Sequence, residues 1–288
     1  MHDDYQRQQS QFRRSLHLQV GALSQERQVA VYEDRQIIMN SIIANAISWV
    51  IRLLILALVL SAVCFGVLAW RVKPVAAAVC PQCYGFEKSA EKVYVQRGMT
   101  DEEQSLVKRN LTLAYDHIRE FYGNIGNHPR ILICATQECI GRFGGNDAAT
   151  GSVGSYVLLL GPKGINVIDI SHELSLMEVS GRIGLYHSLM GAVPAWFDEG
   201  VAVVVSGAPE FTALASSGQN GCRHEFTEDL PADKTKWIEE ASEYPFIYAQ
   251  AGCRVAEWMA SRGGSSAVTR LLTRVANGET FERAYAGH

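Results

Sequence analysis

The sequence has no clustered run of Lys and Arg, and charged residues make up only 19% of its 288 residues. A protein that binds nucleic acid normally presents such a basic cluster on one face, so we expect no nucleic-acid partner. The formal net charge of -4 is mildly acidic and reports mainly on solubility. No internal repeat is visible either. The length favours one or two domains.

Charge is also absent from Leu53–Trp70, and the uncharged stretch Ile42–Ile51 precedes it with Arg52 as the only interruption. A helix needs about 20 apolar residues to cross the hydrocarbon layer of a membrane. The segment Trp49–Trp70 meets that length if the Arg52 side chain reaches toward one surface. Tryptophan stands at both of its ends, where interfacial aromatic residues are common. The sequence therefore predicts one membrane-spanning helix.

Two other interpretations of this apolar run are weaker. A buried core helix rarely has so long an uncharged stretch. A cleaved signal peptide would begin much nearer to Met1 and would have a shorter apolar region. A membrane anchor is therefore the favoured interpretation.

Cysteine is absent before the apolar run, and this absence decides the orientation that we predict. Arg and Lys lie on both sides of the run, so the positive-inside rule does not decide it. One cysteine lies within the run and six follow it: Cys64, then Cys80, Cys83, Cys134, Cys139, Cys222 and Cys253. An even set confined to one side favours disulfides in an oxidising compartment. We therefore expect a cytoplasmic N-terminus and an exported C-terminal part.

These features divide the chain into three parts. Residues 1–41 are polar and Gln-rich and are predicted to form a cytoplasmic tail, helical near Leu16–Asp34. Residues 42–72 contain the membrane helix and its flanks. Residues 73–288 form the exported domain, which begins with a short linker, Pro74–Val79, and is long enough for one hydrophobic core.

Within the exported domain the apolar periodicity predicts strands first and helices later. Thr100 and Glu103 have the spacing of a capping box at the start of a helix. The segments expected to be strands are Arg130–Ala135 and Ser155–Leu160, with a glycine-rich loop, Gly141–Gly154, between them. The expected helices are Thr100–Tyr122, Ser171–Leu189 (loosened at Gly181 and Gly184), Pro194–Ser206, Tyr244–Arg262 and Ser265–Ala276, with a turn at Val167–Ile170. This order argues for an α+β fold.

The segment that points to chemistry is the pair His172-Glu173 inside an apolar helix. A zinc peptidase helix places His at positions i and i+4 and Glu at i+1. That spacing lets both imidazoles reach one metal ion, and the Glu then accepts a proton from the metal-bound water. A second helix, Pro194–Ala202, contains Glu199 at 27 residues beyond His172 and can supply a further ligand.

These residues resemble the gluzincins, and in particular the peptidase MA-like group of zinc metallopeptidases. The segment Trp196–Ala202 has the pattern Trp-x-x-Glu-Gly-x-Ala of that group. The likeness extends through Tyr248–Ala251, Val255–Trp258, Gly263-Gly264, Leu271-Leu272 and Gly278–Phe281, and it covers about residues 155–287. It implies a zincin-like small sheet with an active-site helix, followed by a helical C-terminal subdomain.

The resemblance also implies roles for individual residues. His172 and Glu199 would bind zinc, and Glu173 would be the general base of peptide-bond hydrolysis. Gly200 and Ala202 would allow the two motif helices to pack closely. A downstream tyrosine, Tyr248 or Tyr244, would stabilise the oxyanion, although a packing role fits either residue as well. The expected partners are a membrane and a peptide or protein, and the family favours a bacterial inner membrane with a periplasmic domain.

One position departs from the family pattern, because Leu176 stands where the second His is expected. Leucine cannot bind zinc, so His172 and Glu199 remain as two protein ligands where catalytic zinc sites usually have three. His187 lies 15 residues past His172, about 22 Å along an unbroken helix, and could return only if the chain folds back at a glycine. The other histidines considered, His117, His128 and His224, have no spacing argument and are expected at the surface or in the core.

Asp198 and the strand Ser155–Leu160 flank the motif in sequence or fold and have simpler alternatives. Asp198 adjoins Glu199 but is expected to point to another face and into solvent. The strand Ser155–Leu160 is either an ordinary sheet strand or an edge strand that pairs with an extended peptide.

The cysteines after the membrane helix allow several arrangements. Cys80-Pro-Gln-Cys83 has redox or metal spacing, and a four-cysteine zinc site with Cys134 and Cys139 is one reading. Disulfides are favoured instead. Cys80 and Cys83 would pair with each other or in a crossed arrangement, Cys134 would pair with Cys139, and Cys222 with Cys253.

Three functions are therefore open from the sequence. The first is a membrane-anchored zinc endopeptidase whose activity is impaired at Leu176. The second is a catalytically inactive pseudopeptidase that acts as a binding or scaffolding module. The third, and least favoured, is a disulfide-handling membrane protein that uses Cys80 and Cys83.

Overall fold

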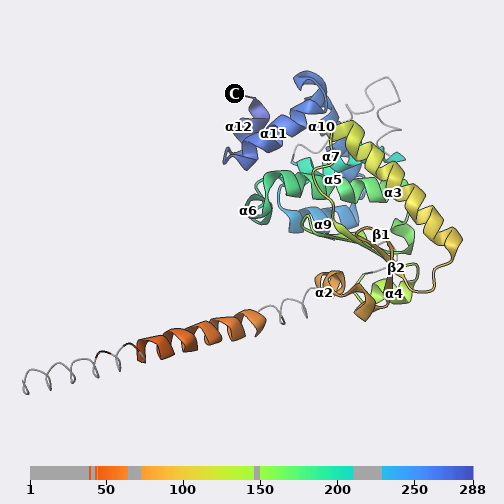
Figure 1. Cartoon of the computed structure of the whole chain (residues 1–288). Coiled ribbons are helices and arrows are strands. Elements are labelled where there is room, and N and C mark those ends of the chain that lie inside the picture. Colours follow the sequence, from red (N-terminus) through yellow and green to blue (C-terminus); the bar gives the residue numbers. More distant parts are fainter. Residues whose placement is uncertain are drawn as a thin grey trace, which may run out of the picture. The chain divides into compact units, whose positions relative to one another are not determined.

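The computed structural model describes residues 45–63, 73–145, 150–209 and 229–287, together with positions 39, 43 and 66 (Figure 1). The chain divides into two compact units, Met1–Leu68 and Ala69–His288. The predicted helix Leu16–Asp34 lies outside the described residues. In the first unit, the helix Asn45–Val63 is the one helix of the described residues that is long and apolar enough to cross a membrane.

None of that helix is buried within the structure. The exposed residues include Leu53, Leu54, Ile55, Leu56 and Leu58. A core helix of a soluble protein would have such side chains covered. The described residues therefore agree with the membrane-anchor interpretation and oppose a buried core helix.

The second unit contains a five-stranded sheet in the order β1-β2-β3-β5-β4. The strands are β1 (Phe86–Ala90), β2 (Val93–Gln96), β3 (Arg130–Ile133), β4 (Thr150–Val153) and β5 (Val157–Leu160). The pairs β2–β3 and β3–β5 are parallel, whereas β1 and β4 add antiparallel edges. The segment around β5 was expected as an ordinary or an edge strand. It is internal, and β4 is the edge strand beside it.

Alternating side chains of the central strands enter two hydrophobic clusters, one on each face of the sheet. In β3, Ile131 and Ile133 belong to the larger cluster, and Leu132 belongs to the smaller one. In β5, Leu158 and Leu160 alternate with Leu159 in the same way. This is the two-residue period of a strand covered on both faces.

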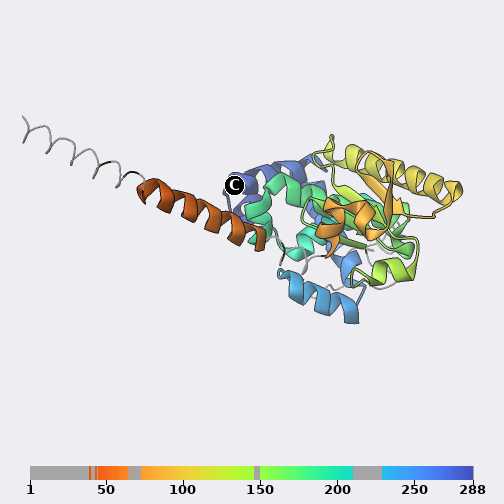
Figure 2. The same cartoon turned by 60° about the horizontal axis from the view of Figure 1, so that its bottom comes forward.

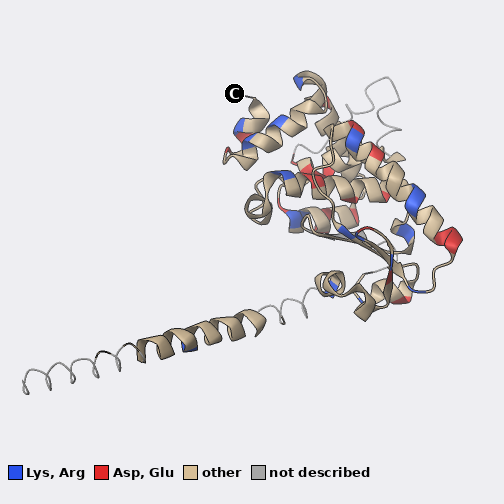
Figure 3. Ribbon diagram, viewed as in Figure 1, with Lys and Arg blue, Asp and Glu red and all other residues tan. Residues whose placement is uncertain are grey.

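The larger cluster is covered by helices α3 (Asp101–Tyr122) and α5 (Val167–Ile183). The capping box that starts α3 is confirmed, because the Thr100 amide donates to a Glu103 carboxylate oxygen over 2.7 Å and the Glu103 amide donates to the Thr100 hydroxyl. Along α3, cationic and anionic side chains are interspersed (Figure 3). Neither sign of charge dominates this helix.

Helix α5 begins earlier than the sequence predicted. The Asn166 side chain accepts a hydrogen bond from the Asp169 amide over 2.9 Å, and this cap starts the helix at Val167. The predicted turn Val167–Ile170 is therefore wrong, and it is the first turn of α5. The helix expected over Ser171–Leu189 is interrupted at Gly184, where loosening was predicted: α5 ends at Ile183 and a separate helix, α6 (Leu185–Leu189), follows, whereas α5 continues through Gly181.

The smaller cluster is covered by short elements near the start of the unit. These are α2 (Lys73–Val79), η1 (Pro81–Tyr84) and α4 (Gln137–Gly141). The linker expected at Pro74–Val79 is instead the helix α2, because Ala77 and Ala78 are buried in this cluster. A second short 3-10 helix, η2 (Pro162–Gly164), leads from β5 toward α5.

Two of the predicted disulfides are present, Cys80–Cys83 and Cys134–Cys139, each with a Cα–Cα distance of 5.4 Å. A four-cysteine zinc site and a crossed pairing are therefore wrong. Cys253 is disulfide-bonded as well, but its predicted partner Cys222 lies outside the described residues.

The C-terminal half of the unit is helical: α7 (Ala195–Ser206), α9 (Lys234–Glu243), α10 (Ile247–Arg262), α11 (Ser266–Ala276) and α12 (Phe281–Ala286). Helix α7 packs against both α5 and α10. The helices α11 and α12 form the C-terminal end (Figures 1 and 2). The unit is therefore a mixed α+β structure that is mostly helical, and all of its described strands precede residue 161.

Candidate functional site

The packing of α5 against α7 brings His172 and Glu199 together. The Nε2 atom of His172 lies 3.0 Å from the Oε2 atom of Glu199, and the Glu199 residue is only 3% exposed. The predicted convergence of these two side chains is therefore observed. The capacity of this pair to hold a metal ion depends on the other groups around it.

A third residue, Lys234, was not anticipated from the sequence. Its ammonium group forms an ion pair with Oε1 of Glu199, so the two oxygens of this carboxylate have different partners, His172 and Lys234. Because Glu199 is buried, its negative charge requires such compensation.

Backbone hydrogen bonds place Lys234 beside α7. The first amides of α7, those of Ala195 and Trp196, donate to the carbonyl oxygens of Ala232 and Pro231 over 2.8 and 3.2 Å. These amides have no partner inside their own helix, and the neighbouring segment satisfies them. The side chain of Asp233 then caps α9 by accepting from the Lys236 amide. Lys234 is thus the first residue of a helix fixed against the start of α7.

The electrostatic consequences are opposite for the acid and the base. Burial alone would raise the pKa of Glu199, but the hydrogen bond and charge of His172, together with Lys234, outweigh it and lower that pKa. Burial alone would lower the pKa of His172, but the hydrogen bond to Glu199 and the charges of Glu199 and Glu173 raise it above its ordinary value. The site therefore favours a charged, mutually paired state.

Lys234 shows the same balance of causes. Burial of the ammonium works to lower its pKa, and the charges of Glu199 and Asp198 raise it. The ammonium therefore stays protonated over the ordinary pH range, and the pair with Glu199 persists.

The two remaining positions of the motif lie on α5. Glu173 follows His172 directly and is buried, as the general-base position would require. Leu176, one turn further along, is 8% exposed and offers no donor atom. The predicted role of Glu173 stays a prediction, because its task depends on a bound metal and water.

Of the two tyrosines considered, Tyr248 lies at the site. Its ring meets that of His172 edge-on with centroids 6.0 Å apart, and it meets the buried Trp237 in the same way at 5.3 Å. Burial, and then the charge of Glu199, raise the pKa of Tyr248. Tyr244 is 48% exposed, and its ring meets that of Phe246 edge-on instead, with centroids 6.0 Å apart.

His172 and Tyr248 line a cavity of about 610 Å³ between α5, α7 and the start of α10. The cavity is mainly apolar with a few polar groups at its wall, which is typical of ligand sites. Its other lining residues include Asn166, Ile168, Asp169, Val203, Pro245 and Phe246.

The prediction that Asp198 is exposed to solvent is wrong. Its Oδ1 atom is buried and has no hydrogen-bond partner among the described residues. Burial raises the pKa of Asp198 to about 7, although Lys234 works in the opposite direction. The sequence reasoning failed here because α7 is surrounded by other helices on most of its faces.

The other histidines do not complete a metal site. His187 lies on α6 and its Nδ1 is 3.1 Å from the carbonyl oxygen of Ile183 in the preceding turn. His117 contacts the Ser171 hydroxyl at 3.1 Å. His224 lies outside the described residues. Within the described ranges, no group of three or more His, Cys, Asp and Glu side chains could hold a metal ion.

The described residues therefore do not fit the zinc ion of a catalytic site. Such a site needs three protein ligands and an open position. The donors here are His172 and Glu199, the position of the missing imidazole is held by Leu176, and Glu199 is also paired with an ammonium group.

No family model, curated protein or solved structure matches this chain. The likeness to the gluzincins therefore rests on the motif residues themselves: His172-Glu173 and Trp196–Ala202, with the Tyr248–Phe281 region behind them. The zinc-ligand role of His172 and Glu199, and the catalytic roles of Glu173 and Tyr248, stay predictions.

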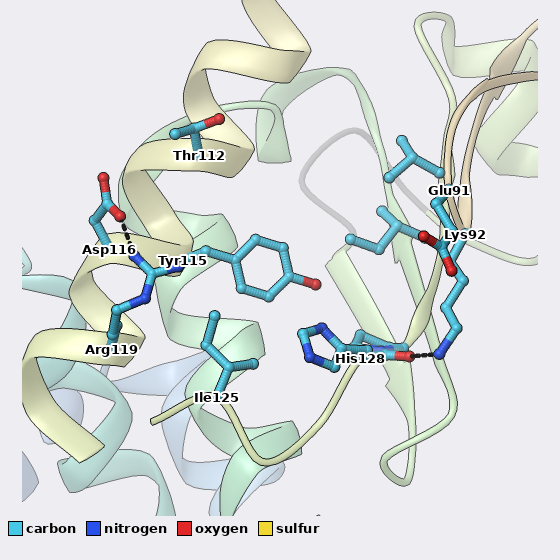
Figure 4. A pocket seen from close by; sticks show the side chains of 11 residues that line it. Glu91, Lys92, Thr112, Tyr115, Asp116, Arg119, Ile125 and His128 are labelled. Atoms are coloured by element: carbon cyan, nitrogen blue, oxygen red, sulfur yellow. Dashed lines mark hydrogen bonds and ion pairs between the residues drawn. The ribbon is translucent and has the colours of Figure 1, made fainter. Parts of the chain in front are cut away.

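A second cavity, of about 470 Å³, lies between α3 and the turn that joins β1 to β2 (Figure 4). The Tyr115 ring points into it from α3, and burial raises the pKa of this tyrosine to about 12. Across the cavity the Lys92 ammonium donates to the carbonyl oxygen of His128 over 3.1 Å. This cavity shares no lining residue with the one at His172.

Proposed function

We propose that this chain is a membrane-anchored pseudopeptidase. Its exported domain keeps a gluzincin-like pair of helices around His172 and Glu199 and binds a peptide or protein without hydrolysing it. The domain would lie in the periplasm of a bacterium, anchored in the inner membrane by the helix Asn45–Val63. The anchor is supported by that helix, which is long and apolar enough to span a membrane.

The observation that carries this proposal is the pairing of Glu199. One of its oxygens is 3.0 Å from His172 and the other is paired with Lys234. Water attacks a peptide bond readily when a metal ion lowers its pKa and polarises the carbonyl group. The donor set does not support such an ion, so Glu173 has no activated water to deprotonate.

The cavity beside His172 supports a binding role. Its volume of about 610 Å³ is in the usual range of ligand sites. Ile168, Val203 and Phe246 supply apolar wall, while Asp169 and Tyr248 supply polar groups. A peptide with an apolar side chain fits this combination.

A second candidate is the active zinc endopeptidase. It is favoured by the position of Glu173 directly after His172 and by the short distance between His172 and Glu199. It requires a third ligand from outside the described residues, and it requires Lys234 to leave Glu199.

The test is to purify the full chain in detergent and to measure its zinc content and its cleavage of a mixed peptide library, with Glu173→Gln as the matched control. We expect far less than one zinc per chain and no difference in cleavage between the two forms. Stoichiometric zinc together with cleavage that Glu173→Gln abolishes would establish the second candidate.

The binding role needs its own measurement. We expect the wild-type chain to bind a subset of a defined peptide array, and Ile168→Ala to weaken that binding because Ile168 lines the cavity and is 36% exposed. Ile238→Ala is the control, because Ile238 is exposed on α9 and does not line the cavity. Binding that neither variant changes would place the peptide elsewhere.

A further inference from the structure

We infer that Lys234 is a built-in cation that takes the place of the metal ion at Glu199. This inference rests on the proposed function and deepens it, because it explains how a frame resembling a metal site stays folded without metal. Lys234 would act as a positioning residue that holds Glu199 and His172 together and also blocks zinc.

The need for a cation follows from the burial of Glu199. Its side chain is 5% exposed, and a buried carboxylate without a partner strongly destabilises a fold. In a metal-bound site the ion would supply the compensating charge. Here the ammonium group of Lys234 supplies the compensating charge at one oxygen of Glu199, and the imidazole of His172 is the partner of the other oxygen.

Backbone hydrogen bonds determine where Lys234 lies, so its contact with Glu199 is not a chance approach of a surface side chain. The carbonyl oxygens of Pro231 and Ala232 accept from the first amides of α7, the helix that holds Glu199. One turn after Lys234, the fully buried Trp237 packs against Tyr248. Helix α9 is therefore held both at the segment just before it, by backbone hydrogen bonds, and at Trp237, by side-chain packing.

The Lys234 side chain lies on the solvent side of the buried Glu199 carboxylate. Its side chain is 54% exposed, whereas that of Glu199 is 5% exposed. A zinc ion approaching Glu199 would meet an ammonium group of like charge at short range, and the two cations would repel each other. Restoring the missing imidazole at Leu176 is therefore not sufficient for tight zinc binding while Lys234 is present.

The stability test compares Lys234→Met with Lys236→Met, a control on the same exposed turn of α9. In the full chain we expect Lys234→Met to lower the melting temperature and Lys236→Met to leave it nearly unchanged. Adding Glu199→Gln to Lys234→Met should recover part of the loss, because the buried side chain at position 199 is then neutral and no longer needs the ammonium partner. A Lys234→Met chain as stable as the wild type would overturn the inference.

The metal test uses the full chain as wild type, Leu176→His, Lys234→Met and the double variant. Zinc affinity is measured by competition with a chromophoric chelator. We expect the double variant to bind zinc about tenfold or more tightly than Leu176→His alone. A double variant that binds no more tightly than Leu176→His, including the case in which neither binds, would overturn the inference.

The two proposals fail in different ways. Zinc and Glu173-dependent cleavage in the wild type would refute the pseudopeptidase. Unchanged stability of Lys234→Met in a zinc-free wild type would refute only the role of Lys234.

Discussion

Gly200 of α7 lies so close to Ala251 of α10 that a Cβ atom on Gly200 would stand 2.5 Å from the Ala251 carbonyl oxygen. The family resemblance implied that this glycine lets the two motif helices, α5 and α7, approach each other. The atoms nearest to Gly200 belong instead to α10, so the glycine allows close packing of α7 against α10, on the side of α7 away from α5. The site at Glu199 therefore depends on a third helix.

We expect Gly200→Ala to destabilise the exported domain by about 1–3 kcal/mol, because the added methyl group forces two helix backbones apart. Urea unfolding of the full chain in detergent, followed by tryptophan fluorescence, measures the change. Gly181→Ala in α5 is the matched control, since its added Cβ would meet the nearest atom at 3.5 Å, an ordinary contact.

For Gly181→Ala we expect unchanged or slightly higher stability, because alanine has the better helix propensity. Equal effects of the two substitutions would show that the contact between Gly200 and Ala251 does not control the packing of α7 and α10.

A second prediction concerns Glu178, a buried carboxylate on α5. It accepts hydrogen bonds from the amides of Gly126 and Asn127, at 2.9 and 2.7 Å, and from Arg182 at 3.0 Å. It therefore ties the loop after α3 to α5. We expect Glu178→Gln to lower the free energy of unfolding by about 3 kcal/mol, since Arg182 and the amides lose a charged acceptor.

The matched control is Asp116→Asn, which removes the carboxylate of an ion pair with Arg119. Those two side chains are 54% and 56% exposed, so we expect a change within about 0.5 kcal/mol. Similar losses from both substitutions in the same urea titration would contradict the structural role of Glu178.

The strands show why the sequence predicted part of the fold. The strands β3 and β5 were found because both of their faces are buried, and RILI and VLLL therefore read as continuous apolar runs. The strands β1 and β2 were missed, because FEKSA and VYVQ are short and polar residues interrupt their apolar pattern. Their positions depend on strand pairing, of β1 with β2 and of β2 with β3, which no local signal contains.

The candidate site divides in the same way. The convergence of His172 and Glu199 was predicted from the resemblance of their two segments to the gluzincin pattern, and both segments are recognisable in the sequence. Lys234 could not be found, because it reaches Glu199 across 35 residues through backbone hydrogen bonds between two segments. The burial of the Asp198 Oδ1 atom was missed for a related reason, because it depends on helices that pack against α7 from several directions.

A third prediction tests whether α12 is part of the core. The Phe281 ring meets those of Trp196 and Phe197 edge-on, with centroids 6.0 and 5.1 Å apart, and stacks on Tyr285. We expect Phe281→Ala to destabilise the domain by about 3–5 kcal/mol, because it leaves a cavity beside the start of α7. The loss should appear as earlier unfolding in urea.

The control for Phe281→Ala is Leu113→Ala, because Leu113 is 50% exposed on α3. We expect the control to change the stability little. A Phe281→Ala chain that unfolds with the wild type would mean that the C-terminal helix does not support the site.

The last prediction concerns the side of the membrane on which the domain lies. Cys80 and Cys83 form a disulfide at the start of the domain, and Cys83 is exposed, whereas Cys134 and Cys139 are buried. After mild reduction, a maleimide that cannot cross membranes should therefore react mainly with the first pair. If the domain is exported, spheroplasts will be labelled without lysis, and the variant Cys80→Ser/Cys83→Ser will lose most of that label. The label that this variant retains gives the background from the other cysteines. Labelling that appears only after lysis would place the domain in the cytoplasm. The argument that predicted the orientation would then fail, because it assumes that the cysteines lie in an oxidising compartment.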